Sequence, residues 1–114
     1  MTGLKGMTYL DKSEDPSNPT EQEEDRDAVT FGSKLVDSVY VDANDQVVLE
    51  VGTGAAISLE SSGWTDCVLW NPHMTMESCY KQFVCVENAQ FSKPVTLEPG
   101  SDWLASVNMS VIDV

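Results

Sequence analysis

Apolar and polar residues alternate with a period of two through most of the chain beyond residue 28. The alternating runs are rich in β-branched residues, and turn-forming Asn, Asp, Gly and Ser residues separate them. This pattern is typical of consecutive antiparallel strands joined by short turns. It predicts an all-β fold, an antiparallel β-sandwich, with strands at 29–31, 37–41, 47–51, 55–59, 67–70, 82–87 and 103–111 and a helical turn within 74–80.

One acidic stretch interrupts this regularity. Residues 13–27 carry seven carboxylates against the single arginine Arg26, and they contain no large apolar side chain. We expect this stretch to be a solvated loop. A loop that contacts a substrate is the alternative. The length of 114 residues allows one domain, which we assign to residues 1–114.

Charge narrows the choice of partners. Six Lys and Arg residues face 19 Asp and Glu residues, for a net charge of −13. Such a chain repels nucleic acid and anionic membranes, so we expect neither as a partner. No apolar run approaches the length of a membrane-spanning helix. A phosphorylated metabolite would also be repelled unless cations gather locally.

Three cysteines and one histidine are too few and too widely spaced for a typical metal site. Cys67, Cys79 and Cys85 lack the paired spacing of zinc ligands, and only His73 could join them. We therefore expect no metal and no cofactor. The odd number of cysteines favours free thiols in a reducing compartment, the cytoplasm or the chloroplast.

Three residues are candidates for chemistry. Glu87 ends a strand that is apolar on both faces, so it is either a solvated strand end or a base held in a cleft. The residues alone favour the solvated end. Asp37, at a strand start, is more typical of a turn cap, and the lone His73 is more typical of packing or of the surface.

Several blocks in order along the chain resemble a known family, the glucose-6-phosphate 1-epimerases of the aldose 1-epimerase superfamily. The resemblance is to the C-terminal part of these hexose-6-phosphate mutarotases and covers nearly the whole chain. The Trp-Asn-Pro-His block and the block that follows it look most like the plant and algal branch, often labelled apospory-associated protein C. The blocks are 4–6, 9–12, 25–31, 36–40, 68–73, 76–80, 83–89 and 97–103.

The resemblance implies a fold, an activity and two site residues. The fold is the galactose mutarotase-like β-sandwich, of which this chain would be a C-terminal portion. The activity is the interconversion of the α and β anomers of hexose 6-phosphates by acid/base ring opening. The family's catalytic glutamate matches Glu87, and a substrate-binding aspartate matches Asp37. We then expect both carboxylates to point toward one concave sheet face and to form a shared site away from bulk water.

The resemblance also implies that something is missing. The family's general-acid histidine and phosphate-binding arginines lie upstream of the first matching block, and His73 does not match the acid position. We therefore expect a truncated chain that is inactive alone. The alternative is a non-catalytic β-sandwich fragment or a carbohydrate-binding or interaction module. A partial sandwich has open sheet edges, which favour self-association.

Overall fold

A computed structural model describes residues 1–114, and the prediction of an all-β antiparallel fold is confirmed. Eight strands and two short 3-10 turns make up the chain, and no helix in it is long and apolar enough to cross a membrane. In chain order the elements are β1 (Thr8–Asp11), β2 (Thr20–Glu23), β3 (Val36–Val41), β4 (Gln46–Glu50), β5 (Ala55–Ser62), β6 (Asp66–Asn71), η1 (His73–Met76), η2 (Tyr80–Gln82), β7 (Cys85–Ala89) and β8 (Ser106–Asp113).

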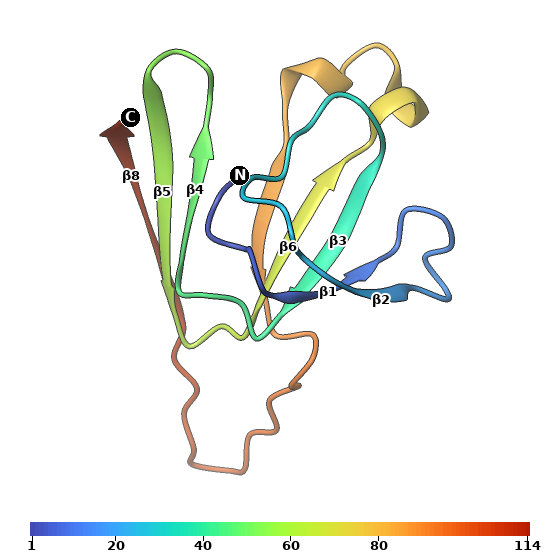
Figure 1. Cartoon of the computed structure of the whole chain (residues 1–114). Coiled ribbons are helices and arrows are strands. Elements are labelled where there is room, and N and C mark those ends of the chain that lie inside the picture. Colours follow the sequence, from blue (N-terminus) through green and yellow to red (C-terminus); the bar gives the residue numbers. More distant parts are fainter.

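The strands form two antiparallel sheets that diverge from a shared core (Figure 1). The five-stranded sheet has the order β2-β1-β3-β6-β7, and the three-stranded sheet has the order β4-β5-β8. The chain changes sheet between β3 and β4, between β5 and β6, and between β7 and β8. The last of these connections, residues 90–105, hangs below both sheets in Figure 1.

The core lies where the two sheets meet. Because successive side chains of a strand point to opposite faces, alternate residues of β3 and β6 turn inward. These include Tyr40 and Leu69, which are fully buried, and they pack with Val47 of β4 and Leu59 of β5. The remaining core members come from the strands and from the loop segments between them: Met1, Leu4, Tyr9, Val29, Val36 and Cys67.

The acidic stretch departs from its prediction as a solvated loop. Its residues Thr20–Glu23 form the edge strand β2, which pairs with β1 along its whole length. Glu24, directly after β2, is 2% exposed. Composition suggested a loop because the stretch has no large apolar side chain, but an edge strand needs only backbone partners and can be polar on both faces. Residues 13–19 are the part that matches the prediction, being mostly exposed and without regular structure.

Other strands also differ from the prediction: β1 was not predicted, and β5 ends at Ser62 rather than at residue 59. The predicted strand at 29–31 is absent, and Val29 is instead buried in a loop whose backbone amide donates to the Met1 carbonyl. β7 begins at Cys85 rather than at residue 82, because η2 occupies Tyr80–Gln82. β8 begins and ends two to three residues later than expected. Apart from 29–31, the predicted runs are strands, whereas their ends depend on contacts that are distant in sequence.

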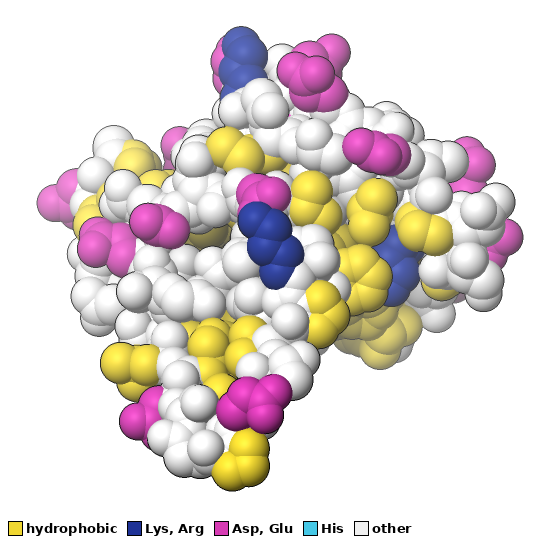
Figure 2. Space-filling view, turned by 90° about the horizontal axis from the view of Figure 1, so that it is seen from below, with side chains coloured by type: hydrophobic (Ala, Val, Ile, Leu, Met, Phe, Trp, Pro, Cys, Tyr) yellow, Lys and Arg dark blue, Asp and Glu magenta, His cyan; other side chains and the backbone are white.

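The inner face of the three-stranded sheet extends beyond its cover. Val107, Met109 and Val111 of β8 align with the inward side chains of β5, but they are 44%, 67% and 77% exposed. β8 is also a free edge strand, as is β7 in the other sheet. Figure 2 shows apolar side chains exposed on the underside of the molecule, with carboxylates scattered among them. The open edges that were expected of a partial sandwich are therefore present, together with an uncovered apolar face.

Candidate functional site

The two predicted site residues lie on the same face of the five-stranded sheet. Directly opposed residues of an antiparallel pair share a face, as do alternate residues along a strand. Asp37 of β3 is opposite Trp70 of β6, which is opposite Cys85 of β7. Val39 is opposite Val68, which is opposite Glu87. We call the face formed by these two rows, with Leu10 of β1 opposite Val39, the outer face, because it points away from the core.

Glu87 and Asp37 share this face without touching each other. They are two strands and two residues apart, which puts their Cα atoms about 12 Å from one another. Glu87 is exposed and Asp37 is half-buried, and neither carboxylate has a hydrogen bond or ion pair. Both residues lie on one sheet face, as expected. The expectation of a shared site away from bulk water is wrong for Glu87, which is exposed, and the two carboxylates are too far apart to touch. A ring-sized ligand could lie between the two carboxylates over Trp70 and Val68.

Asn71 at the end of β6 fixes the approach to β7. Its side chain is buried, and its amide nitrogen donates to the carbonyl oxygens of Tyr80 and Phe83, each at 2.8 Å. Its amide oxygen accepts the backbone N–H of His73 at 3.0 Å. Asn71 thereby ties both ends of the 72–83 loop to the sheet, and Glu87 lies four residues beyond that loop. The Trp-Asn-Pro block thus has a structural reason for its asparagine.

Asp66, at the other end of β6, fixes the exit from β7. Its buried carboxylate accepts the backbone N–H groups of Phe91 and Ser92 and the Ser92 hydroxyl, at 2.6–2.7 Å. Burial by itself would raise the pKa of Asp66, but the hydrogen bonds from Ser92, Asp42 and Phe91 outweigh it and lower the pKa. The ionised Asp66 therefore holds the segment that follows β7. Together with Asn71, it fixes β7 at both ends.

The two thiols near Glu87 are poor nucleophiles. Burial, and to a smaller extent the negative charge of Glu87, raise the pKa of Cys67 to about 11. The pKa of Cys85, two residues from Glu87 on the outer face, is raised by the same two causes. Thiols with raised pKa values stay protonated at neutral pH, and nucleophilic catalysis needs the thiolate.

His73 lies beyond the sheet, on η1. Its ring packs edge-on against the Tyr80 ring, with centroids 4.9 Å apart. Its φ of 48° is in the left-handed region, which is uncommon for a residue with a side chain. The hydrogen bond from its backbone N–H to Asn71 helps to hold this conformation. The contact with Tyr80 agrees with a packing role for the lone histidine.

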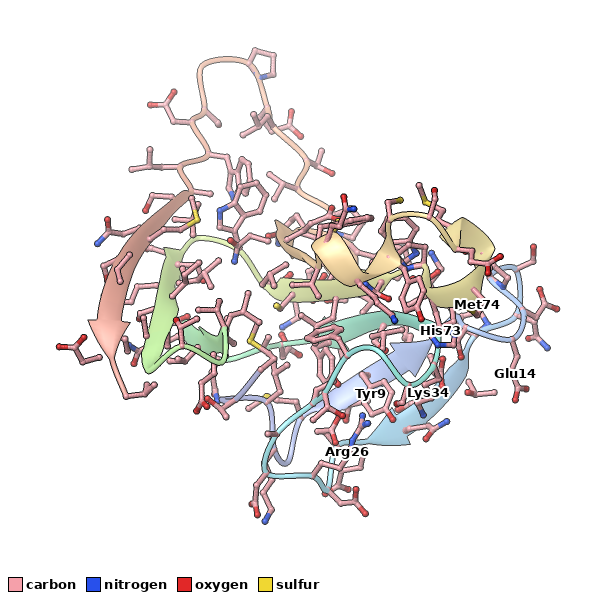
Figure 3. All side chains as sticks on the ribbon, turned by 90° about the horizontal axis from the view of Figure 1, so that it is seen from above. Tyr9, Glu14, Arg26, Lys34, His73 and Met74 are labelled. Carbon is pink, nitrogen blue, oxygen red and sulfur yellow. The ribbon has the colours of Figure 1, made fainter.

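A buried ionic group that the sequence pattern did not predict lies on the opposite, core-facing side of the sheet. The carboxylate of Glu24 accepts hydrogen bonds from Nε and Nη2 of Arg26, at 2.7 and 2.8 Å, and from the Tyr40 hydroxyl at 2.6 Å. Burial would raise the pKa of Glu24, but these partners lower it overall. Tyr9 stacks against Tyr40, and Tyr9, Arg26 and Lys34 border one small cleft (Figure 3). The only sequence signal was a single arginine inside an acidic run.

The largest cavity of the molecule lies elsewhere. It has a volume of about 880 Å³ and opens between the two sheets, and residues of the 28–32 loop, the end of β4 and the 80–84 segment line it. Neither Asp37 nor Glu87 borders this cavity. The outer face is instead an open surface, so any ligand held there would have one side in solvent or under another part of a protein.

Comparison with known proteins matches the chain to a family. The family model described as aldose 1-epimerase matches residues 1–110. A protein of Cenchrus ciliaris, provisionally named glucose-6-phosphate 1-epimerase, is 32% identical over 119 aligned residues, which cover 96% of this chain. The match covers 35% of that relative, so the chain spans about a third of its length. No solved structure matches significantly. The match over nearly the whole chain shows that this protein belongs to the aldose 1-epimerase family.

Proposed function

We propose that this chain provides the catalytic base and a substrate-binding carboxylate of a glucose-6-phosphate 1-epimerase. Such an enzyme interconverts the α and β anomers of hexose 6-phosphates. The observation that carries the proposal is the position of Glu87 and Asp37 on one outer face, with the Trp70 side chain between their strands. The name of the Cenchrus ciliaris relative supports the choice of substrate.

In this proposal, Glu87 moves the proton and Asp37 holds the ring. The Glu87 carboxylate takes the proton from the anomeric hydroxyl O1 while an acid protonates the ring oxygen O5. The C1–O5 bond breaks, the C1–C2 bond rotates, and the reverse transfers close the ring as the other anomer. Asp37 accepts hydrogen bonds from sugar hydroxyls. The Trp70 ring offers an apolar surface to the sugar's C–H groups.

The acid that serves O5 does not come from His73 in this proposal. His73 packs against Tyr80 beyond the sheet, and it is the only histidine of the chain. We propose that the acid comes from outside these 114 residues and that the chain alone is inactive. A positioned proton-transfer group contributes about 10²–10⁴-fold to a rate, so half of the pair leaves little activity.

The test measures anomer exchange of glucose 6-phosphate by exchange NMR. The chain is assayed alone and after co-expression with the part of the Cenchrus ciliaris relative that the match leaves uncovered, about two-thirds of its length. We expect the spontaneous rate for the chain alone and an accelerated rate for the pair. In the pair, Glu87→Gln should lower the enzymatic rate at least about 100-fold.

The matched control is Glu50→Gln, which removes the same charge from an exposed site on the other sheet. The control should keep the rate of the unmodified pair. Acceleration by the chain alone that survives Glu87→Gln would contradict the proposal, as would a pair that is indifferent to this change.

A further inference from the structure

We propose that Lys12 is a substrate-binding residue that contacts the phosphate of the hexose 6-phosphate. This inference rests on the proposed function, and it concerns a residue that carries no role in it. It would give the outer face one cation beside its two carboxylates.

The register of β1 and β3 places Lys12 next to Asp37. The last paired residues of the ladder are Asp11 and Ser38, and the backbone N–H of Lys12 continues it by donating to the Asp37 carbonyl oxygen at 2.8 Å. Lys12 is therefore opposite Asp37, and opposed residues share a face. The row of the outer face that contains Asp37 therefore consists of Lys12, Asp37, Trp70 and Cys85.

Lys12 is one of three cations of this acidic protein that form no ion pair. Three of the six cations are held in ion pairs: Lys5 with Asp27, Arg26 with Glu24, and Lys93 with Asp42. Lys12, Lys34 and Lys81 have no such partner. Lys34 borders the small cleft that Arg26 and Asp37 also line, and Lys81 borders the large cavity between the sheets. Among the free lysines, only Lys12 belongs to the outer face.

The positions of Lys12 and Glu87 match the two ends of the substrate. They lie three strands and two residues apart, so their Cα atoms are about 16 Å from one another. A hexose 6-phosphate has its reacting carbon C1 and its phosphate at opposite ends of the molecule. With C1 at Glu87 and the ring over Trp70, the phosphate points toward β1. The flexible four-carbon stem of Lys12 can follow it there.

A phosphate near this face also needs a cation for an electrostatic reason. The net charge is −13, and the two carboxylates of the face add to the local repulsion. An ammonium group beside Asp37 offsets that repulsion for the phosphate alone and does nothing for a neutral sugar. Among the residues of this chain, Lys12 is therefore the one expected to favour phosphorylated over neutral hexoses.

The test compares binding of glucose 6-phosphate and glucose by NMR titration of the isotope-labelled chain. We expect glucose 6-phosphate to bind about tenfold more tightly than glucose and to shift the amides of residues 10–12, 37–39 and 68–70. Lys12→Met should remove this preference and leave glucose binding unchanged. Lys12→Arg keeps the charge and should keep the preference. Raising the salt concentration should weaken it, since the site is open to solvent.

Lys81→Met is the matched control, because it removes one free lysine that lies outside the outer face. It should keep the preference for glucose 6-phosphate. Equal preference in Lys12→Met and the unmodified chain would overturn the role of Lys12 and leave the proposed function standing. If Lys12→Met weakens the binding of both sugars equally, Lys12 contacts a sugar hydroxyl rather than the phosphate, and the proposal is overturned. An unmodified chain that binds neither sugar would overturn this inference, whereas the proposed function is decided by the exchange rate of the pair and its response to Glu87→Gln.

Discussion

The five-stranded and three-stranded sheets differ in how fully their apolar side chains are covered. On the inward face of the five-stranded sheet, Tyr40 and Leu69 are completely buried. In the three-stranded sheet, cover stops at β5, where Leu59 is 8% exposed, and the aligned residue of β8, Met109, is 67% exposed. Both sheets have strands of the same chemical type. Burial is therefore decided by what lies opposite a strand, and the five-stranded sheet covers only β4 and β5.

The largest expected effect is the difference in stability loss between truncating a buried side chain and truncating an exposed one. Leu69→Ala should lower the free energy of unfolding by about 3 kcal/mol, because it removes buried methyl groups and leaves a cavity. Met109→Ala should change it by no more than about 0.5 kcal/mol. Urea denaturation followed by circular dichroism measures both. Equal losses would mean that β8 is covered in solution and would remove the contrast between the sheets.

A smaller effect is expected from the buried ionic group of the five-stranded sheet. Glu24→Gln should lower the free energy of unfolding by about 2 kcal/mol at neutral pH, because the Arg26 and Tyr40 hydrogen bonds lose a charged acceptor. The folded state lowers the pKa of Glu24. Its contribution is therefore complete above the unfolded value near 4.5 and is lost as the pH falls through the lower folded value.

The variant should accordingly lose less stability on acidification than the unmodified chain does. Glu21→Gln on the exposed strand β2 is the control. It should leave nearly unchanged both the free energy of unfolding at neutral pH and its decrease on acidification. A Glu24→Gln chain with an unaltered acid profile would show that this network does not anchor the five-stranded sheet.

The smallest effect on stability is expected from adding charge to β8. Met109→Lys together with Val111→Lys should change the free energy of unfolding little, because both positions are exposed. The same pair should reduce self-association, since lysines on an edge strand oppose pairing with another chain. Sedimentation velocity over a range of concentrations measures this.

Leu104→Lys, in the connection before β8 and 87% exposed, is the control. Each added lysine also lowers the net negative charge, which weakens the electrostatic repulsion between chains. On this ground alone, all three substitutions would increase self-association. Reduced association that is specific to the β8 pair would support self-association through that strand. If the unmodified chain is monomeric at every concentration, the uncovered face of β8 does not cause association.

The period-two pattern predicted the fold class and most strands because it reports which side chains must turn inward. It also placed Glu87 and Asp37 on strands whose register gives them a common face. It could not predict β2 or the burial of Glu24, because these depend on the backbone of β1 and on the hydroxyl of Tyr40. It could not reveal Lys12 as a neighbour of Asp37 either, since cross-strand pairing is not encoded in local spacing.

The late position of β8 in the chain has a consequence for the order of folding. The β4–β5 and β6–β7 pairs join neighbouring strands, whereas β8 pairs with β5 only after the chain has passed through β6, β7 and the long connection. Closing such a loop costs chain entropy before any contact repays it. We therefore expect β8 to dock after the rate-limiting step. Ile112→Val should then speed unfolding and leave the folding rate unchanged in a chevron analysis, so that the last strand made is also the first released.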